Sequence, residues 1–154
     1  VPDNSLPFAA QAAEVEVDME LGLVKVLKIA AAHDVGKVIN PRLCEGQVEG
    51  GVLQGVGWAV REEMTYEEGK GFYNTGFHKY MLPTADDHPE IISILVESND
   101  PKGTFGMKGI GEVGCIPTLP AIFSAVEDAT GVRFEEAPLT PDRVLAGLKA
   151  AGKI

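Results

Sequence analysis

The sequence is short of cysteine and of basic residues. Its two cysteines, Cys44 and Cys115, are far apart and lack CxxC spacing, so they cannot supply the four ligands of a zinc site or an iron–sulfur cluster. Two free thiols favour a reducing compartment, and we expect the cytoplasm. Thirteen basic residues stand against 23 acidic ones, a net charge of −10. This excess disfavours nucleic acid as a partner, because no basic face can follow a phosphate backbone.

Long apolar runs, internal repeats, low-complexity tracts and linkers are absent as well. A membrane-spanning helix needs about 18 consecutive apolar residues, which the sequence does not contain. The first residues, Val1–Asn4, do not resemble a signal or transit peptide. We therefore expect a soluble chain with no membrane partner, organised as a single domain over residues 1–154.

Periodicity in the sequence predicts an α+β fold. Alternating apolar and charged residues predict a β-hairpin with arms at Ala13–Val17 and Leu23–Ala32 and a turn at Glu20–Gly22. The second arm becomes nearly all apolar, which favours a strand buried on both faces. After an irregular stretch over residues 72–90, Ile91–Val96 predicts another short buried strand.

Three helices are expected to pack with these strands. The first begins at Asn40 and runs to about Glu63, the second lies between Pro117 and Gly131, and the third follows Thr140. Asparagine or threonine before proline is a typical helix start, and glycine is a typical helix end.

Glycine is abundant in the first helix. The 18 glycines are roughly 12% of the chain, against a usual share of about 7%. Those expected in this helix cost roughly 1 kcal/mol each relative to alanine, and they are Gly46, Gly50, Gly51, Gly55 and Gly57. An apolar stripe that includes Val48, Val52 and Val56 forms the packing face, and Gln47, Gly51 and Gly55 lie on another side.

Two compatible explanations of these glycines stay open. Small residues spaced by four, from Gly46 to Gly50 and from Gly51 to Gly55, allow close packing of the helix. Alternatively, the backbone approaches a bulky ligand whose polar edge is bound by the amide of Gln47.

The glycine-rich loop Thr104–Gly114 contains a single carboxylate, Glu112, which is the candidate catalytic residue. Glycines on either side leave it uncrowded and permit unusual backbone dihedrals. The alternative is a solvated glutamate without function. Residues 109–114 also match the dinucleotide fingerprint G-x-G-x-x-G, but no apolar strand precedes them and Pro117 and Pro120 interrupt the helix that should follow.

The three histidines do not form a metal-binding motif. None of them has H-x3-H spacing, so we assign no metal ligands among the side chains. His33 is expected to be structural, and Asp34 to accept a hydrogen bond within its own turn.

The order of these segments resembles that in one known family. The segments are His33–Gly36, Ile39–Pro41, Glu45–Gly51, Gln54–Gly57, Lys108–Glu112 and Pro138–Pro141. Along essentially its whole length, the chain resembles the C-terminal part of the molybdenum-binding subunit of the xanthine dehydrogenase family, which includes aldehyde oxidoreductases and carbon monoxide dehydrogenase.

The resemblance implies a molybdenum hydroxylase and the fold of its C-terminal cofactor-binding domain. In that family a molybdenum–pyranopterin cofactor, sometimes as the cytosine dinucleotide, oxidises an electron-poor carbon with oxygen from water. The glutamate matching Glu112 lies beside the metal and acts as general base, and the glutamine matching Gln47 contacts the pterin. Gly46 and Gly111 are implied as backbone that lets cofactor and loop come close.

The resemblance also implies partners, because the family's large subunit is several times longer. We expect the remainder of the molybdenum subunit, an iron–sulfur subunit and a flavin subunit to carry the iron–sulfur clusters, FAD and most contacts to a small-molecule substrate. Without them the chain should be catalytically silent. Two alternatives stay open: a non-catalytic assembly module, and a nucleotide-binding protein that uses Gly109–Gly114.

Overall fold

The computed structural model describes residues 5–154. The strands are β1 (Ala9–Val17), β2 (Val24–Asp34), β3 (Tyr66–Glu67), β4 (Gly71–Phe72) and β5 (Glu90–Val96). The α-helices are α1 (Pro41–Val60), α2 (Thr118–Thr130) and α3 (Pro141–Ala150), and short 3-10 turns lie at Ala85–Asp87 and Thr104–Gly106. Within the described residues, no helix is both long and apolar enough to cross a membrane.

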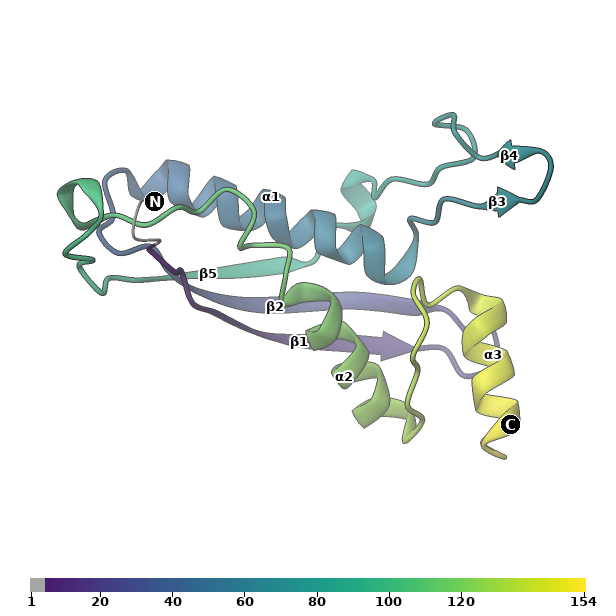
Figure 1. Cartoon of the computed structure of the whole chain (residues 1–154). Helices are drawn as coiled ribbons and strands as arrows, with labels where there is room; N and C mark the ends of the chain where they lie inside the picture. The colour runs from purple at the N-terminus through teal and green to yellow at the C-terminus, as the bar shows by residue number, and fades with distance from the viewer. Residues whose placement is uncertain (1–4) are drawn as a thin grey trace.

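Three strands form one sheet in the order β1-β2-β5 (Figure 1). β1 and β2 are the antiparallel arms of a hairpin, which pairs Ala9 with His33 at one end and Val17 with Val24 at the other. β5 lies parallel to β2 on its other side, so α1 belongs to the crossover between them. The inward-facing side chains of the sheet contact α1 and α2, which also contact each other.

The core fills the space between the sheet and these two helices. Its members are Val26, Ile29 and Ala31 of β2, Val48, Val52, Val56 and Ala59 of α1, Ile122 and Val126 of α2, and Val132, Leu139, Val144 and Leu148 near the C-terminus. The apolar stripe predicted on the first helix is therefore its packing face.

Capping residues fix the ends of the helices. The side chain of Asn40 accepts a hydrogen bond from the backbone N–H of Leu43 at 3.2 Å, and Pro41 is the first residue of α1. Thr140 caps α3 in the same way, and Gly131 ends α2 in the left-handed conformation. The predicted hairpin, the three helices and the strand β5 are confirmed, and the fold is α+β.

Residues 5–154 cover the sheet on one face only, which corrects a prediction. Side chains on the other face form an open sheet face, made of Ala10, Ala12, Ala30, Ala32, Ile92, Ile94 and Val96. Ile92 and Ile94 are 42% and 46% exposed. The expectations that β2 is buried on both faces and that β5 is a buried strand are wrong, because an apolar run does not reveal which faces the rest of the chain covers.

Two further boundaries differ from the prediction. β1 begins at Ala9 rather than Ala13, because pairing with β2 extends through a run of alanines that has no alternating pattern. The stretch over residues 72–90 is not wholly irregular: β4 reaches into it and pairs with β3, and a 3-10 turn follows at Ala85–Asp87. β3 and β4 project beyond the C-terminal end of α1 (Figure 1).

Gly51 and Gly55 of α1 pack against the segment that leads into α2. A Cβ added to Gly51 would lie 2.8 Å from the Cα of Gly114, and one added to Gly55 would lie 2.5 Å from the Cβ of Thr118. Carbon atoms that are not bonded do not approach so closely. The prediction that Gly51 and Gly55 lie on a side that does not pack is therefore wrong, whereas close packing through this pair is confirmed.

Gly51→Ala should destabilise the chain, because the backbone of Gly114 cannot swing away as a flexible side chain could. We expect the free energy of unfolding to fall by on the order of 1–3 kcal/mol, measured by urea denaturation. Gly46→Ala is the control: its Cβ would meet no atom within 4 Å, so the helix should gain up to about 1 kcal/mol. A Gly51→Ala chain as stable as the unmodified one would contradict this account.

Candidate functional site

The loop that carries Glu112 crosses α1 at Gly51. A Cβ added to Gly114 would lie 3.2 Å from the Cα of Gly51 and 3.5 Å from the carbonyl oxygen of Gln47. Two segments far apart in the sequence therefore lie side by side. They carry all four of the predicted site residues, Gly46, Gln47, Gly111 and Glu112.

These four residues are all exposed. The side chains of Gln47 and Glu112 make no hydrogen bond or ion pair with the described residues. A Cβ added to Gly46 or Gly111 would meet no atom within 4 Å. An amide, a carboxylate and bare backbone thus face outward, where they can bind a ligand.

Lys108 anchors the beginning of the loop. Its Nζ lies 2.5 Å from Oδ2 of Asp34, and both side chains are nearly buried, at 9% and 10% exposed. The same Nζ donates a hydrogen bond to the carbonyl oxygen of Leu6 at 3.0 Å. This ion pair fixes the loop to the end of β2, and it is not predictable from local sequence because its partners are 74 positions apart.

Asp34 also closes the turn after β2, as predicted. Its Oδ1 accepts hydrogen bonds from the backbone N–H of Gly36 at 3.0 Å and from the hydroxyl of Ser98 at 2.7 Å. Burial alone would raise the pKa of Asp34, but hydrogen bonds from Lys108, Ser98 and Gly36 outweigh it and hold the pKa below its usual value.

A buried polar network anchors the end of the loop at the carbonyl oxygen of Gly114. Nε2 of Gln11 donates to this oxygen at 2.8 Å, and the hydroxyl of Thr118 lies 3.0 Å from it. The same hydroxyl lies 2.7 Å from Oε1 of Gln11, and Nε2 of Gln11 lies 3.2 Å from Nε2 of His33. We call Gln11, His33 and Thr118 the Gly114 clamp.

The Gly114 clamp includes one predicted structural residue and two that were missed. His33 is 1% exposed and holds Gln11, as expected of a structural histidine. Gln11 is the one polar side chain in a stretch of alanines on β1, which was the available signal for it. Thr118 carries no local signal, because a threonine in the first turn of a helix is ordinary.

The loop does not have the context of a dinucleotide site. Residues 109–114 follow a 3-10 turn at Thr104–Gly106 rather than a strand. The helix α2 begins at Thr118 after Pro117, which makes no side-chain cap. The strand, turn and helix required by the G-x-G-x-x-G fingerprint are therefore not found around these residues.

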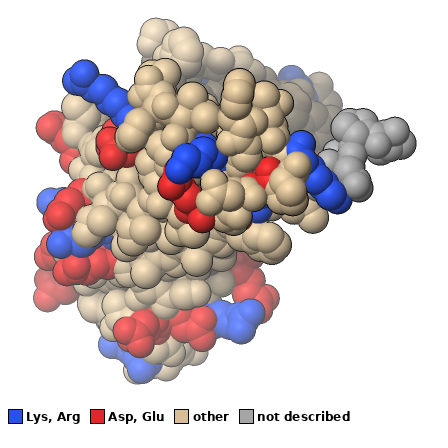
Figure 2. All heavy atoms as spheres, turned by 90° about the vertical axis from the view of Figure 1, so that its left-hand side faces the viewer, with Lys and Arg blue, Asp and Glu red and all other residues tan. Residues whose placement is uncertain are grey.

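Charges of both signs lie side by side at the end of the molecule shown in Figure 2, within a larger uncharged surface. Lys37 and Glu97 form an ion pair at 3.0 Å, which joins the turn after β2 to the end of β5.

Cys44 and Cys115 are both free. Within residues 5–154, no group of three or more His, Cys, Asp or Glu residues could hold a metal ion.

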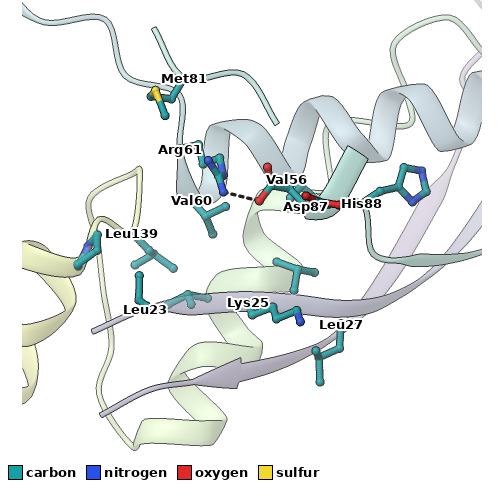
Figure 3. A pocket seen from close by; sticks show the side chains of 14 residues that line it. Leu23, Lys25, Leu27, Val56, Val60, Arg61, Met81, Asp87, His88 and Leu139 are labelled. Carbon is teal, nitrogen blue, oxygen red and sulfur yellow. Dashed lines mark hydrogen bonds and ion pairs between the residues drawn. The ribbon is translucent and has the colours of Figure 1, made fainter. Parts of the chain in front are cut away.

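A separate cavity of about 730 Å³ lies near the other end of α1 (Figure 3). Its lining includes apolar side chains of Val56 and Leu139, and an ion pair between Arg61 and Asp87 lies beside them. None of the four predicted site residues lines this cavity, so it is not the predicted site.

Comparison with solved structures identifies the class of the fold. Quinoline 2-oxidoreductase from Pseudomonas putida 86 is similar with a TM-score of 0.85 and 32% identity, over 90% of this chain and 18% of that one. Aldehyde oxidoreductase from Desulfovibrio gigas is similar with a TM-score of 0.85 and 31% identity, over 93% of this chain and 15% of that one. The fold is that of a domain of the molybdenum hydroxylases.

Sequence comparison identifies the family. Residues 1–89 match the family model described as molybdopterin cofactor-binding domain. The xanthine dehydrogenase molybdenum-binding subunit of Escherichia coli O157:H7 is 40% identical over 152 residues, which are 98% of this chain and 20% of that subunit. The chain therefore belongs to the molybdopterin cofactor-binding domain family, of the xanthine dehydrogenase type, and the predicted resemblance is confirmed. It spans about a fifth of the length of the curated relatives it matches.

The buried state of His33 gives a prediction for stability. Burial lowers the pKa of His33 from the usual 6.5, so the unfolded chain binds a proton at a higher pH than the folded chain does. The stability that depends on a neutral His33 is fully present above about pH 6.5 and is lost as the pH falls below that value. We expect the urea midpoint to fall between about pH 7 and pH 5, a range in which carboxylates stay ionised.

His33→Gln should flatten this pH dependence, because glutamine does not titrate. The measurement is the urea midpoint of both chains at matched pH values. A His33→Gln chain with the same slope between pH 7 and pH 5 as the unmodified chain would contradict the assignment to His33.

Proposed function

We propose that this chain forms part of the molybdopterin site of a molybdenum hydroxylase, with Glu112 as general base and Gln47 as a contact to the pterin. The observation that carries the proposal is the crossing of Gly51 and Gly114. It places the turn of α1 that bears Gln47 beside the loop that bears Glu112. Both side chains are exposed and make no interaction with the described residues.

The residues present fit such a cofactor. At Gly46, Gly50, Gly109 and Gly111 an added Cβ would meet no atom within 4 Å, so packing within the chain does not require glycine there. Gly46 and Gly50 lower helix propensity, which a ligand approaching the helix backbone would explain. Gln47 would hold the polar edge of the pterin, because its amide both donates and accepts hydrogen bonds.

When bound, the molybdenum–pyranopterin cofactor, as molybdopterin or its cytosine dinucleotide, supplies two-electron oxidation of a carbon with oxygen from water. Glu112 accepts a proton at a carboxylate oxygen during this reaction, so it must be ionised at the start. Lys108 and Gly114 hold the two ends of its loop, and Gly111 leaves the space beside it open.

The complete enzyme would contain further polypeptide. We propose the remainder of the molybdenum subunit, an iron–sulfur subunit and a flavin subunit, which would carry the iron–sulfur clusters, FAD and most substrate contacts. This chain spans only about a fifth of the length of its relative in Escherichia coli O157:H7, which supports this proposal. Its two free cysteines, too few to hold an iron–sulfur cluster, support it as well. The chain alone would be inactive, and its two free thiols favour the cytoplasm.

Glu112→Gln should lower turnover of the assembled enzyme about 10²- to 10⁴-fold, the usual contribution of a general base, because an amide cannot accept the proton. Molybdenum content should stay unchanged. Steady-state kinetics and elemental analysis on the same preparation test both statements. Glu127→Gln, at an exposed position on α2, is the control and should keep full turnover. Near-normal turnover of Glu112→Gln would exclude the general-base role.

Gln47→Ala should weaken retention of the cofactor instead of stopping the chemistry. Losing one hydrogen bond to the pterin should raise the cofactor's dissociation constant roughly 3- to 10-fold, measured as molybdenum lost during dialysis. The control is Gln54→Ala, an exposed glutamine two turns further along the same helix. Equal molybdenum retention in the two variants would contradict the contact.

The open sheet face favours a second candidate, an assembly module that binds another polypeptide without touching a cofactor. Its apolar side chains, including Ile92 and Ile94, are exposed in the described structure. Purification of the chain with its natural partners distinguishes the two functions. Molybdenum in that complex would support the hydroxylase, and a stable complex without molybdenum would support the assembly module.

A further inference from the structure

The Gly114 clamp lies directly behind the loop that carries Glu112. The carbonyl oxygen of Glu112 is 3.2 Å from the backbone nitrogen of Cys115 and 3.0 Å from its Sγ. The segment from Glu112 to Cys115 is thus a closed turn, and Gly114 lies within it. This turn links the position of Glu112 to that of Gly114.

Hydrogen-bond chemistry fixes the orientation of Gln11. The carbonyl oxygen of Gly114 can only accept, so the amide nitrogen of Gln11 must point to it. The amide oxygen then faces the hydroxyl of Thr118 at 2.7 Å. The second amide hydrogen points to Nε2 of His33, which must be the unprotonated nitrogen. Every polar atom of the Gln11 side chain therefore has a partner.

Thr118 is held in place by the same crossing that brings the two segments of the site together. It is 0% exposed, and its Cβ lies where a Cβ on Gly55 would come within 2.5 Å. The helix α1 therefore blocks the side chain from turning away from Gly114. The Gly114 clamp brings side chains of β1 and α2 to one carbonyl oxygen, and His33 of β2 contacts Gln11 behind them.

The loop is held at its two ends and, between them, by Ile110, which packs against the core. Lys108 is fixed by Asp34 at the start, and Gly114 is fixed at the end by Gln11, which Thr118 holds in place. Between them, a Cβ added to Gly109 or Gly111 would meet no atom within 4 Å. After Ile110, the next anchor of the loop is Gly114, so the placement of Glu112 between them depends on how Gly114 is held.

We propose that Gln11 and Thr118 are positioning residues for Glu112: Gln11 donates to the carbonyl oxygen of Gly114, and Thr118 donates to Oε1 of Gln11 and holds its amide in that orientation. The proposal rests on the general-base role proposed for Glu112. The Thr118 hydroxyl has one hydrogen, and because Oε1 of Gln11 and the carbonyl oxygen of Gly114 both only accept, it donates to the nearer Oε1 and so holds Gln11 against Gly114. An apolar side chain in its place would keep the volume but leave Oε1 of Gln11 without a donor. The turn would then be free to shift, and a shift of about 1 Å is enough to lower a rate on the order of 100-fold.

The test uses the assembled enzyme, which consists of this chain and the polypeptides that complete it. Thr118→Val should speed hydrogen exchange of the backbone amides in residues 109–115 at least about tenfold. It should also lower kcat about 10- to 100-fold with KM and molybdenum content unchanged. Thr118→Ser should restore both properties, because it restores the hydroxyl. Gln11→Leu, the second variant, should reproduce Thr118→Val.

Thr130→Val is the matched control. Thr130 is another buried threonine of α2, and its hydroxyl donates to the carbonyl oxygen of Val126 at 2.7 Å. Its loss should reduce stability without changing loop exchange or kcat. If Thr118→Val behaves like Thr130→Val in both measurements, the positioning role is overturned and Thr118 is only structural.

The same experiment separates this proposal from the proposed function. Faster hydrogen exchange of residues 109–115 in Thr118→Val, together with full turnover of Glu112→Gln, would support the role of the Gly114 clamp in fixing the loop. It would overturn only the general-base role of Glu112. Unchanged loop exchange in Thr118→Val and Gln11→Leu, together with inactive Glu112→Gln, would overturn the positioning role and leave the general base intact.

Discussion

Where α1 crosses the loop before α2, backbone packs directly on backbone. A Cβ on Gly51 would lie 2.8 Å from the Cα of Gly114, which leaves no room for a side chain there, and one on Gly114 would make a tight contact of 3.2 Å with the Cα of Gly51. This one contact sets how far α1 lies from α2 and therefore how the two helices share the core above the sheet. It also places Gln47 beside the turn of Glu112 and Gly55 behind Thr118, so the fold and the candidate site share one steric constraint.

The two anchors of the Glu112 loop differ in chemistry. At the start, a nearly buried ion pair joins Lys108 to Asp34, and removing one partner of such a pair leaves an uncompensated charge. At the end, neutral groups meet at the carbonyl oxygen of Gly114. The neutral anchor adds no charge beside Glu112, whereas the charged anchor lies at the opposite end of the loop, where it ties the loop to β2.

Much of the fold could be predicted because its signals are local. Asn40, Gly131 and Thr140 mark helix ends by their own conformational preferences, and alternation of apolar residues marks the hairpin. The glycine patterns around them made Glu112 and Gln47 candidates, whereas their roles at a molybdenum cofactor, and the choice of Gly46 and Gly111, came from the family resemblance. The Gly114 clamp could not be predicted, since Gln11 and Thr118 come from opposite ends of the sequence and meet only after folding. For the same reason periodicity could not separate the tightly packed Gly51 from the open Gly46.

The open sheet face has a thermodynamic consequence. Its isoleucines, Ile92 and Ile94, keep nearly half of their surface in water, and fully burying an aliphatic side chain contributes roughly 1.5–3 kcal/mol relative to leaving it exposed. A polypeptide that covers this face binds only the folded chain, so by mass action it shifts the folding equilibrium toward the native state. The stability of this chain is therefore a function of its surroundings, and a melting temperature measured in dilute solution is a lower bound for the chain in such a complex.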